Sequence, residues 1–523
     1  MNPEPISQDR LVHGTLRAIV VVIGAAIALS TVYVAPRLGS QGGSNPAGSA
    51  VGATNDTSST DQGATGGGAA PAQAGGGGSG GVAGGAGGGA KPGAAGAQPH
   101  GGPAGLSCPK NNGGKTDIGV DGGNVYLAAT EVESGIGSSF LLPVRYGMLA
   151  VVQKVNRSGG ICGRQLQLTL KDDAWDATRG KEYLDTFISE NYFALAVVPS
   201  SEGLNNASGG GDIDSAPDPV NGGQGIPVVG SDGMLNSQYT DPWIWPVAAS
   251  TATSMRVMEH DAFKRGARTL GLVYNGSYKF GVEGAGAFVA QAKRDGAKVA
   301  CIEKLDASQN DYSNQVNEFN KACGKQGPNG GVDFVALLLE PQTAETWLGS
   351  GSGPYLGNRD NGSGYGAGGP QPLFDYNFGN TCGATCANLE VWTSFYPPIY
   401  PYDQRPEVQT FKHDLCTADP KDCNVDADSA FTEGGYVGMQ LLVQALQQTS
   451  PYLTRQGLRQ TLDAMTLRTG LSADLTFRKG GHNANKSMVA FRDQYGQQFT
   501  GFQIVNGSQQ DDPCGSCQDP PLS

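Results

Sequence analysis

Small polar residues that could bind an anionic ligand follow the apolar run at residues 195–198. Ser200 and Ser201 stand directly after this run and begin a segment with a helical pattern. A helix start offers unpaired backbone N–H groups and the positive end of the helix dipole, and serine hydroxyls add further donors. The two serines therefore predict contacts with a ligand carboxylate. The alternative is that one serine only caps the helix.

A second polar group, at Ser231 and Asp232, follows the apolar run at residues 226–229. The Ser231 hydroxyl could donate to the same ligand, and the Asp232 carboxylate is a reasonable partner for a ligand ammonium group. A helix cap or a turn acid is an equally open interpretation of Asp232. Both groups of polar residues indicate that a ligand is bound, and neither indicates a catalytic reaction.

Residue patterns that would support catalysis are weak in this chain. Gly114-Lys115-Thr116 resembles the end of a phosphate-binding loop, but proline stands at position 109 where glycine is needed. The three histidines in the later part of the chain show neither the spacing of a zinc site nor a serine elbow to serve. These are His260, His413 and His482. We expect no catalytic residue, no metal site and no cofactor.

The ten cysteines all lie at or after Cys108, which fits a compartment that permits disulfides. Their spacing suggests four short local bridges and leaves the first two cysteines as a fifth pair. The expected pairs are Cys301 with Cys323, Cys382 with Cys386, Cys416 with Cys423, Cys514 with Cys517, and Cys108 with Cys162. A redox motif or zinc knuckle is the alternative for the last local pair, but no helix and no second ligand pair follow it.

The N-terminal fifth of the chain is unlike the rest. Residues 18–35 form an apolar run between arginines, at the short edge of a membrane span, so residues 1–38 are expected to be a signal peptide or a membrane anchor. A small-residue site at 28–30 would allow cleavage, whereas the arginines and the following tether favour anchoring. Residues 39–107 hold about a third of the 81 glycines and predict a flexible linker with an end-to-end distance of roughly 45 Å.

The formal net charge is −13 and argues against a groove for nucleic acid. From residue 124 onward, short apolar runs alternate with helical patterns, which is typical of an α/β fold with parallel sheets. Strands are expected at 125–130, 165–171, 195–198 and 226–229, and a second series at 270–274, 298–303 and 334–339. Two series imply two doubly wound, Rossmann-like lobes with a ligand cleft at the carboxyl ends of the strands.

The order of several short motifs resembles the type I periplasmic binding proteins of the branched-chain amino acid class. The resemblance covers roughly residues 124–505. The motifs that carry it are Tyr146-Gly147, residues 156–164, residues 168–173, Asp176-Ala177-Thr178, Val198-Pro199-Ser200-Ser201, Gly225-Ile226-Pro227-Val228 and Tyr278-Lys279-Phe280-Gly281. In that family the chain crosses between the lobes three times. Carried over, residues 124–247 and 399–469 form lobe 1, residues 248–398 and 470–506 form lobe 2, and residues 507–523 form a C-terminal tail.

The resemblance also implies a binding site and partners. Phe140 matches a position where the family places an aromatic ring against the ligand, and Phe280 matches one across the cleft. Tyr376 replaces an acid that holds the ligand amine, and Glu340 or Asp375 could compensate. Two Gly-rich insertions, at 208–224 and 349–371, are expected at the amino ends of the strands, away from the ligand.

The function that the resemblance implies is that of an extracytoplasmic receptor. It would capture a small amino acid-like ligand and deliver it to the membrane permease of an ABC importer, with the N-terminal segment as its contact with the membrane. A sensory receptor with the same fold is the alternative, and a surface protein with an inactive cleft is a third possibility. The chain contains no kinase or output segment, which favours import.

Overall fold

The computed structural model describes residues 112–522, except 210, 232, 308, 325–330, 353–365, 383–385, 387–388, 422, 494–501 and 516. Within this part the first lobe is built on a five-stranded sheet in the order β2-β1-β3-β6-β7, with all neighbouring strands parallel. Its strands are β1 (Asn124–Glu131), β2 (Gln165–Asp172), β3 (Ala194–Leu195), β6 (Val228–Val229) and β7 (Ile244–Trp245).

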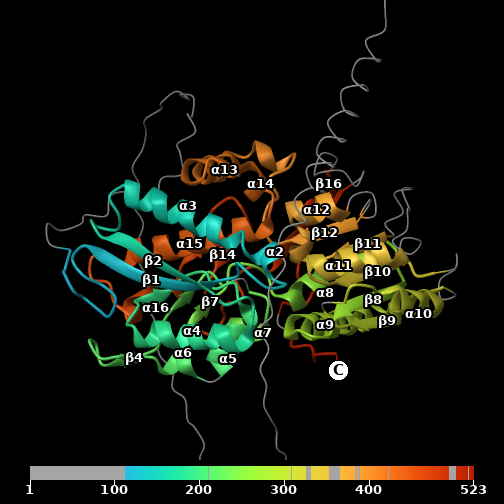
Figure 1. Ribbon diagram of the computed structural model, residues 1–523, viewed down its shortest axis with the longest axis horizontal. Coiled ribbons are helices and arrows are strands. Elements are labelled where there is room, and N and C mark those ends of the chain that lie inside the picture. Colours follow the sequence, from blue (N-terminus) through green and yellow to red (C-terminus); the bar gives the residue numbers. More distant parts are fainter. Residues whose placement is uncertain are drawn as a thin grey trace, which may run out of the picture. The chain divides into compact units, whose positions relative to one another are not determined.

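Helices cover both faces of this sheet, as expected of a doubly wound lobe. Figure 1 shows α3 and α15 on one side of the strands and α4 and α5 on the other. The helices between the strands are α2 (Ser138–Leu141), α3 (Val144–Arg157), α4 (Ala177–Ser189), α5 (Ser201–Gly209), α6 (Asp212–Ser215) and α7 (Asn236–Thr240). The first insertion forms α6 and a small hairpin of β4 (Pro217–Asp218) and β5 (Gly223–Gln224).

The second lobe is built on a seven-stranded sheet in the order β16-β15-β12-β11-β10-β8-β9. Five of its strands, β12, β11, β10, β8 and β9, are parallel to one another. At the other edge, β15 and β16 are added in antiparallel orientation. The strands are β8 (Thr269–Asn275), β9 (Lys298–Leu305), β10 (Phe334–Leu338), β11 (Gly366–Gly369), β12 (Leu389–Thr393), β15 (Ser487–Asp493) and β16 (Phe502–Asp511).

The remaining helices divide between the two lobes. Those of the second lobe are α8 (Thr251–Lys264), which precedes β8, and α9 (Lys279–Asp295), α10 (Ser313–Cys323), α11 (Pro341–Trp347) and α12 (Tyr376–Cys382), which follow strands of the second sheet. The late helices are α13 (Pro406–Ala418), α14 (Cys423–Asp426), α15 (Ala430–Thr449) and α16 (Arg455–Leu462). Both α13 and α15 pack on α3 of the first lobe, so the chain returns to that lobe after β12.

The contact of α3 with α15 is close enough to require glycine on both helices. A Cβ atom at Gly147 would lie 2.1 Å from the carbonyl oxygen of Thr432, and one at Gly435 would lie 2.1 Å from that of Val144. Because these neighbours are backbone atoms, a small side-chain shift could not make room. The two glycines therefore fix the position of the α15 N-terminus against the first lobe.

Three passages of the chain between the lobes lie side by side. The backbone N–H of Ala249 donates to Ser394 Oγ at 2.8 Å, and Asn485 Nδ2 donates to the carbonyl oxygens of Val247 and Ser394 at 3.0 and 3.4 Å. Asn485 is buried between these two other passages. These hydrogen bonds join all three passages at one hinge.

The last segment of the second lobe begins after residue 484, and not at residue 470 as the sequence predicted. Residues 475–476 form β14, which pairs with β13 (Thr466–Leu467) beside α16. His482 Nε2 lies 3.0 Å from Asp463 Oδ1, and its Nδ1 lies 2.6 Å from the carbonyl oxygen of Ile244. Residues up to 484 therefore stay with the first lobe, because their polar partners belong to α16 and β7.

The C-terminal residues are also more ordered than a simple tail. β16 continues to Asp511, past the expected boundary at 506. Beyond it, Arg256 of α8 pairs with Asp512 at 2.7 Å and with Asp519 at 3.1 Å, and all three side chains are almost fully buried. Leu522 donates its N–H to the carbonyl oxygen of Val282 in α9 at 2.9 Å. We call residues 512–522 the C-terminal strap.

Two further differences concern the second insertion. Its last residues form β11, a strand of Gly-Ala-Gly-Gly that no apolar pattern predicts. A Cβ at Gly369 would lie 2.2 Å from Leu373 Cδ1, so side chains from neighbouring segments fill this part of the sheet. The insertion was predicted at the amino ends of the strands, but its first residues lie near a carboxyl end. Ser350 Oγ accepts the N–H of Tyr312, which follows the carboxyl end of β9.

Four disulfides join the local cysteine pairs that the spacing suggests. They are Cys301–Cys323, Cys382–Cys386, Cys416–Cys423 and Cys514–Cys517. Cys162 is also disulfide-bonded, and its expected partner, Cys108, lies outside the described residues.

Candidate ligand site between the lobes

A row of aromatic rings crosses from one lobe to the other beyond the carboxyl ends of the strands. Trp175, in the turn between β2 and α4, stacks on Tyr278 of the second lobe with ring centroids 4.2 Å apart. Phe280 lies 5.8 Å from Trp175 on one side, and Phe140 lies 5.4 Å from it on the other. Phe431, 5.3 Å from Phe140, completes the row. We call these five residues the aromatic row.

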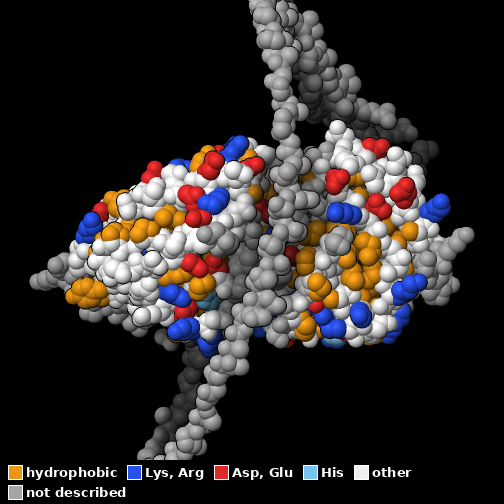
Figure 2. All heavy atoms as spheres, turned by 90° about the horizontal axis from the view of Figure 1, so that it is seen from below, with side chains coloured by type: hydrophobic (Ala, Val, Ile, Leu, Met, Phe, Trp, Pro, Cys, Tyr) orange, Lys and Arg blue, Asp and Glu red, His pale blue; other side chains and the backbone are white. Residues whose placement is uncertain are grey.

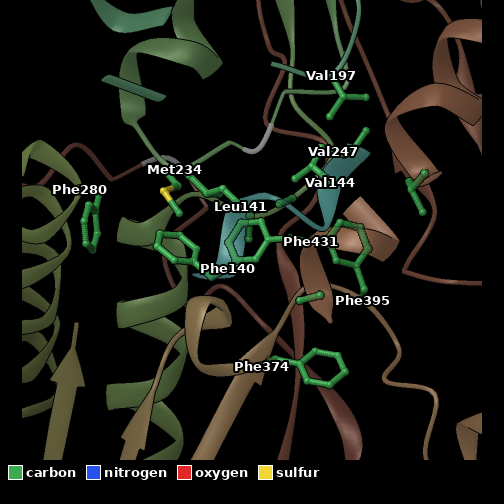
Figure 3. Packing of buried hydrophobic residues seen from close by; sticks show 14 of the residues in the cluster. Phe140, Leu141, Val144, Val197, Met234, Val247, Phe280, Phe374, Phe395 and Phe431 are labelled. Carbon is green, nitrogen blue, oxygen red and sulfur yellow. The ribbon is translucent and has the colours of Figure 1, made fainter. Parts of the chain in front are cut away.

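Phe140 and Phe280, the two rings expected beside a ligand, both belong to the aromatic row. Figure 3 shows Phe140 between Phe280 and Phe431. Both predicted rings are almost completely buried, at 0% and 1% exposure. The structure thus brings them to the same lobe interface, although Trp175 lies between them.

Trp175 is a candidate ligand residue that the sequence analysis missed. Its indole Nε1 is buried and has no hydrogen-bond partner among the described residues. An indole N–H can only donate, and a buried donor without an acceptor is costly. A ligand oxygen between the lobes would satisfy it. The signal in the sequence was a single tryptophan within a polar turn at the end of β2.

A buried carboxyl group holds the Trp175 turn in place. Asp173 Oδ1 accepts the backbone N–H of Trp175 at 2.9 Å, and Trp175 has a positive φ of 60°. Burial raises the pKa of Asp173 to about 6, and the nearby hydroxyls of Thr130 and Ser200 offset only part of this rise. Asp173 therefore positions the indole through its hydrogen bond to the backbone of the turn.

The structure gives the two predicted serines different surroundings. Ser201 Oγ lies 3.7 Å from the Met234 sulfur, and Figure 3 places Met234 beside Phe140. Ser200 Oγ lies over the contact between α4 and α5, 3.3 Å from the Cβ positions of Gly180 and Gly203, and forms no hydrogen bond of standard geometry. Ser201 is therefore the serine nearer the lobe interface, and Ser200 faces the interior of its own lobe beside Asp173.

Ser231 and Thr432 are two of the further buried hydroxyls that lack partners within the described part of the chain. Ser231, which follows β6, was predicted to contact the ligand, whereas Thr432, in the first turn of α15, was not. The α15 start touches the second lobe, because Ala430 donates its N–H to the carbonyl oxygen of Phe374 at 3.2 Å. No sequence pattern marks Thr432, since its role depends on where the start of α15 lies against the other lobe. Asp232 lies outside the described residues.

The two acids predicted to hold a ligand amine, Glu340 and Asp375, already have partners in the protein. Glu340 Oε2 accepts from Asn275 Nδ2 at 2.6 Å, and Glu340 Oε1 accepts from Thr343 Oγ1. Asp375 Oδ1 accepts the N–H of Phe378 at 3.1 Å and so caps α12. Burial, and then the charge of Glu340, raise the pKa of Tyr278 in the aromatic row to about 12. Tyr376 begins α12, and its side chain is outside the description.

Two surface pockets lie elsewhere and contain none of the predicted site residues. One, of about 590 Å³, is lined by residues such as Asp311, Glu345 and Ser350 at the edge of the second lobe. The other, of about 420 Å³, is lined by residues such as Lys115 and Tyr126 at the far end of the first lobe. Neither pocket is lined by Trp175, Ser231 or Thr432.

Other kinds of site find little support in the described residues. No group of three or more His, Cys, Asp or Glu side chains among them could hold a metal ion. On the face shown in Figure 2, the described Lys and Arg side chains are interspersed with Asp and Glu and form no continuous basic band. A search of the described helices finds none that is long and apolar enough to cross a membrane.

Comparison with known proteins agrees with this two-lobed class. The family model described as "Periplasmic binding protein" matches residues 124–497. Among solved structures, a fatty acid ABC transporter substrate-binding protein from Thermomonospora curvata is similar at 17% identity and a TM-score of 0.62, covering 79% of this chain and 98% of that chain. No curated protein sequence matches.

Two further neighbours are described with their ligands. The solute-binding protein of an ABC transporter from R. palustris, in complex with benzoate, is 15% identical with a TM-score of 0.58 over 74% of this chain and 96% of its own. The branched-chain amino acid transporter substrate-binding protein LivJ from Streptococcus pneumoniae, in complex with isoleucine, is 12% identical with a TM-score of 0.57 over 73% and 99%.

The fold and the lobe interface define a two-lobed solute-binding protein. The match over most of the chain shows that it belongs to the periplasmic binding protein family, and its fold is the two-lobed type I fold of that family. This family consists of solute-binding proteins and is not a class of enzymes. Its members bind small molecules, work with ABC transporter permeases and act outside the cytoplasm.

Proposed function

We propose that the chain binds a small carboxylate between its lobes and delivers it to the permease of an ABC importer. The ligand would be an amino acid or a related acid or amide. The N-terminal segment would tether the receptor to the membrane through the Gly-rich linker. No catalytic step is part of this function.

The observation that carries the proposal is the set of buried donors without partners at the lobe interface. Trp175 Nε1, Ser231 Oγ and Thr432 Oγ1 all lack a hydrogen bond within the described residues. Leaving a buried donor unpaired costs about 1–3 kcal/mol, whereas a carboxylate oxygen would accept from such groups strongly. The set therefore fits an anionic ligand better than an apolar one.

The aromatic row suggests the shape of the rest of the ligand. Its rings would pack against an apolar or aromatic body, since aromatic surfaces stack well on one another. The benzoate and isoleucine of the two neighbours have such a body next to a carboxylate. Glu340 is the acid placed to hold an ammonium group, although Asn275 and Thr343 already use its two oxygens.

A thermal-shift screen of the purified full chain tests the proposal. The panel should contain branched-chain and aromatic amino acids, their amides, benzoate, fatty acids and polyamines. A ligand at about a hundred times its Kd stabilises the folded state by roughly 2.7 kcal/mol, which is readily seen as a rise in melting temperature. We expect a rise with one class of carboxylate. A rise with polyamines alone, or with no compound, would contradict the proposal.

A further inference from the structure

A glutamate of the first lobe caps a helix of the second. Glu202 Oε1, in α5, accepts the backbone N–H of Lys279 at 2.9 Å. Lys279 is the first residue of α9, and Tyr278 before it provides no side-chain cap. The first N–H groups of a helix have no partner within the helix, so this carboxylate satisfies a donor that would otherwise be unpaired.

The same helix returns the contact to the first lobe. Glu283, one turn into α9, accepts the backbone N–H of Asn236 through Oε2 at 2.9 Å. Asn236 is the first residue of α7, and Leu235 before it also provides no side-chain cap. Each lobe therefore supplies the carboxylate that caps a helix start in the other.

A lysine links these two contacts. Lys279 Nζ donates to Asn205 Oδ1 of the first lobe at 2.7 Å and lies 3.8 Å from Glu283 Oε1. Burial raises the pKa of both Glu202 and Glu283, in spite of their hydrogen bonds. The contacts are thus partly removed from water. Hydrogen bonds to a charged group are stronger in such surroundings than in water.

We infer that Glu202 and Glu283 form a reciprocal latch that holds the two lobes together and sets ligand affinity without touching the ligand. Both hydrogen bonds exist only while the lobes are in contact, so they stabilise the closed form alone. A ligand that binds between closed lobes gains apparent affinity in proportion to the population of that form. Glu202 and Glu283 are therefore positioning residues.

Hydrogen exchange of the full chain without any added ligand tests the latch. The variants are Glu202→Ala and Glu283→Ala, with peptides spanning residues 276–283 and 233–240 as readouts. Losing a charge-assisted hydrogen bond should speed exchange in these peptides by about tenfold or more. Because opening the lobes breaks both contacts, each variant should speed exchange in both peptides, including the one that its own side chain does not touch.

Two comparisons make the test specific. Glu182→Ala removes an exposed carboxylate of α4 and should leave both peptides unchanged. Glu202→Gln and Glu283→Gln keep an acceptor oxygen but lose the charge, so their exchange rates should fall between those of wild type and the alanine variants. An effect confined to the variant's own peptide, no effect at all, or faster exchange that extends into β1 and β8 would overturn the latch.

Discussion

At the scale of single residues, the lobe interface is defined by donors that the protein leaves unpaired. Ser231 was predicted as a ligand contact because it follows an apolar strand in sequence, where a ligand site is common, and this contact stays a prediction. Ser201 follows another apolar strand, but its hydroxyl lies 3.7 Å from the Met234 sulfur. Trp175 and Thr432 could not be predicted, since their value depends on a turn geometry and a helix position set by the tertiary fold. The different orientations of Ser200 and Ser201 also depend on packing, here the close contact of α4 with α5.

Trp175→Phe separates the indole N–H from the aromatic surface. The variant keeps a ring against Tyr278 but removes Nε1, which has no partner within the described chain. We expect the affinity for the carboxylate found by screening to fall about tenfold with little change in stability. Titration calorimetry measures the affinity of the wild-type chain and of the variant. Trp347→Phe, in the second lobe away from the aromatic row, is the matched control, and an equal loss of affinity there would contradict the assignment.

At the scale of elements, the helices depend on contacts that the sequence only partly reveals. Strands with long apolar runs, such as β1, β2, β8 and β10, match their predicted positions closely. β11 was missed because its four residues are Gly-Ala-Gly-Gly and neighbouring side chains supply its apolar cover. α9 begins at Lys279 although Tyr278 provides no side-chain cap, because Glu202 of the other lobe caps its first turn.

The contact of α3 with α15 should tolerate no added methyl group. Gly435→Ala would place Cβ 2.1 Å from the carbonyl oxygen of Val144, so the helices must move apart. We expect the free energy of unfolding to fall by about 1–3 kcal/mol, as for other overpacked cores. Urea unfolding followed by circular dichroism gives this value. Gly481→Ala, where a Cβ meets nothing within 4 Å, should be close to neutral.

The C-terminal strap should contribute strongly to the stability of the second lobe. Asp512→Asn removes the charge that pairs with Arg256, whose side chain is only 4% exposed. Breaking a buried ion pair on one side costs about 3–5 kcal/mol, because the other charge stays buried, and Asp519 can offset part of this here. Limited proteolysis should release the strap faster in the variant. Asp474→Asn, at an exposed pair with Arg468, should change neither stability nor proteolysis.

At the scale of the whole molecule, the described chain starts at the end of the first lobe opposite the second. Arg164, just before β2, donates to the carbonyl oxygens of Asp121 and Gly114 at 2.8 and 3.1 Å, and to that of Asn112. These contacts fix the first described residues beside the amino ends of β1 and β2.

Several buried carboxyl groups should make the whole protein more stable at mildly acidic pH. Burial raises the pKa of Asp241 and Glu345 to about 7, and that of Asp173 and Asp428 to about 6. These values lie above those of the unfolded chain, so the folded state binds more protons across this range. The stability that these groups contribute is present below the unfolded pKa and is lost as the pH rises through the folded values.

We therefore expect a higher melting temperature at about pH 5.5 than at about pH 7.5. Differential scanning calorimetry in buffers of matched ionic strength measures the difference. Asp241→Asn should reduce it, because one of the groups with a raised pKa no longer titrates. A melting temperature that rises from the lower to the higher pH would contradict this interpretation.

We expect one small carboxylate to bind between the two lobes, against the aromatic row and the unpaired donors. The test is titration calorimetry of the full chain with the compound that gives the largest thermal shift, carried out on the wild type and on the double variant Trp175→Ala and Thr432→Val. We expect a single saturable site in the wild-type chain and loss of most of its affinity in the double variant. If the folded double variant binds as tightly as the wild type, the carboxylate does not bind at this interface.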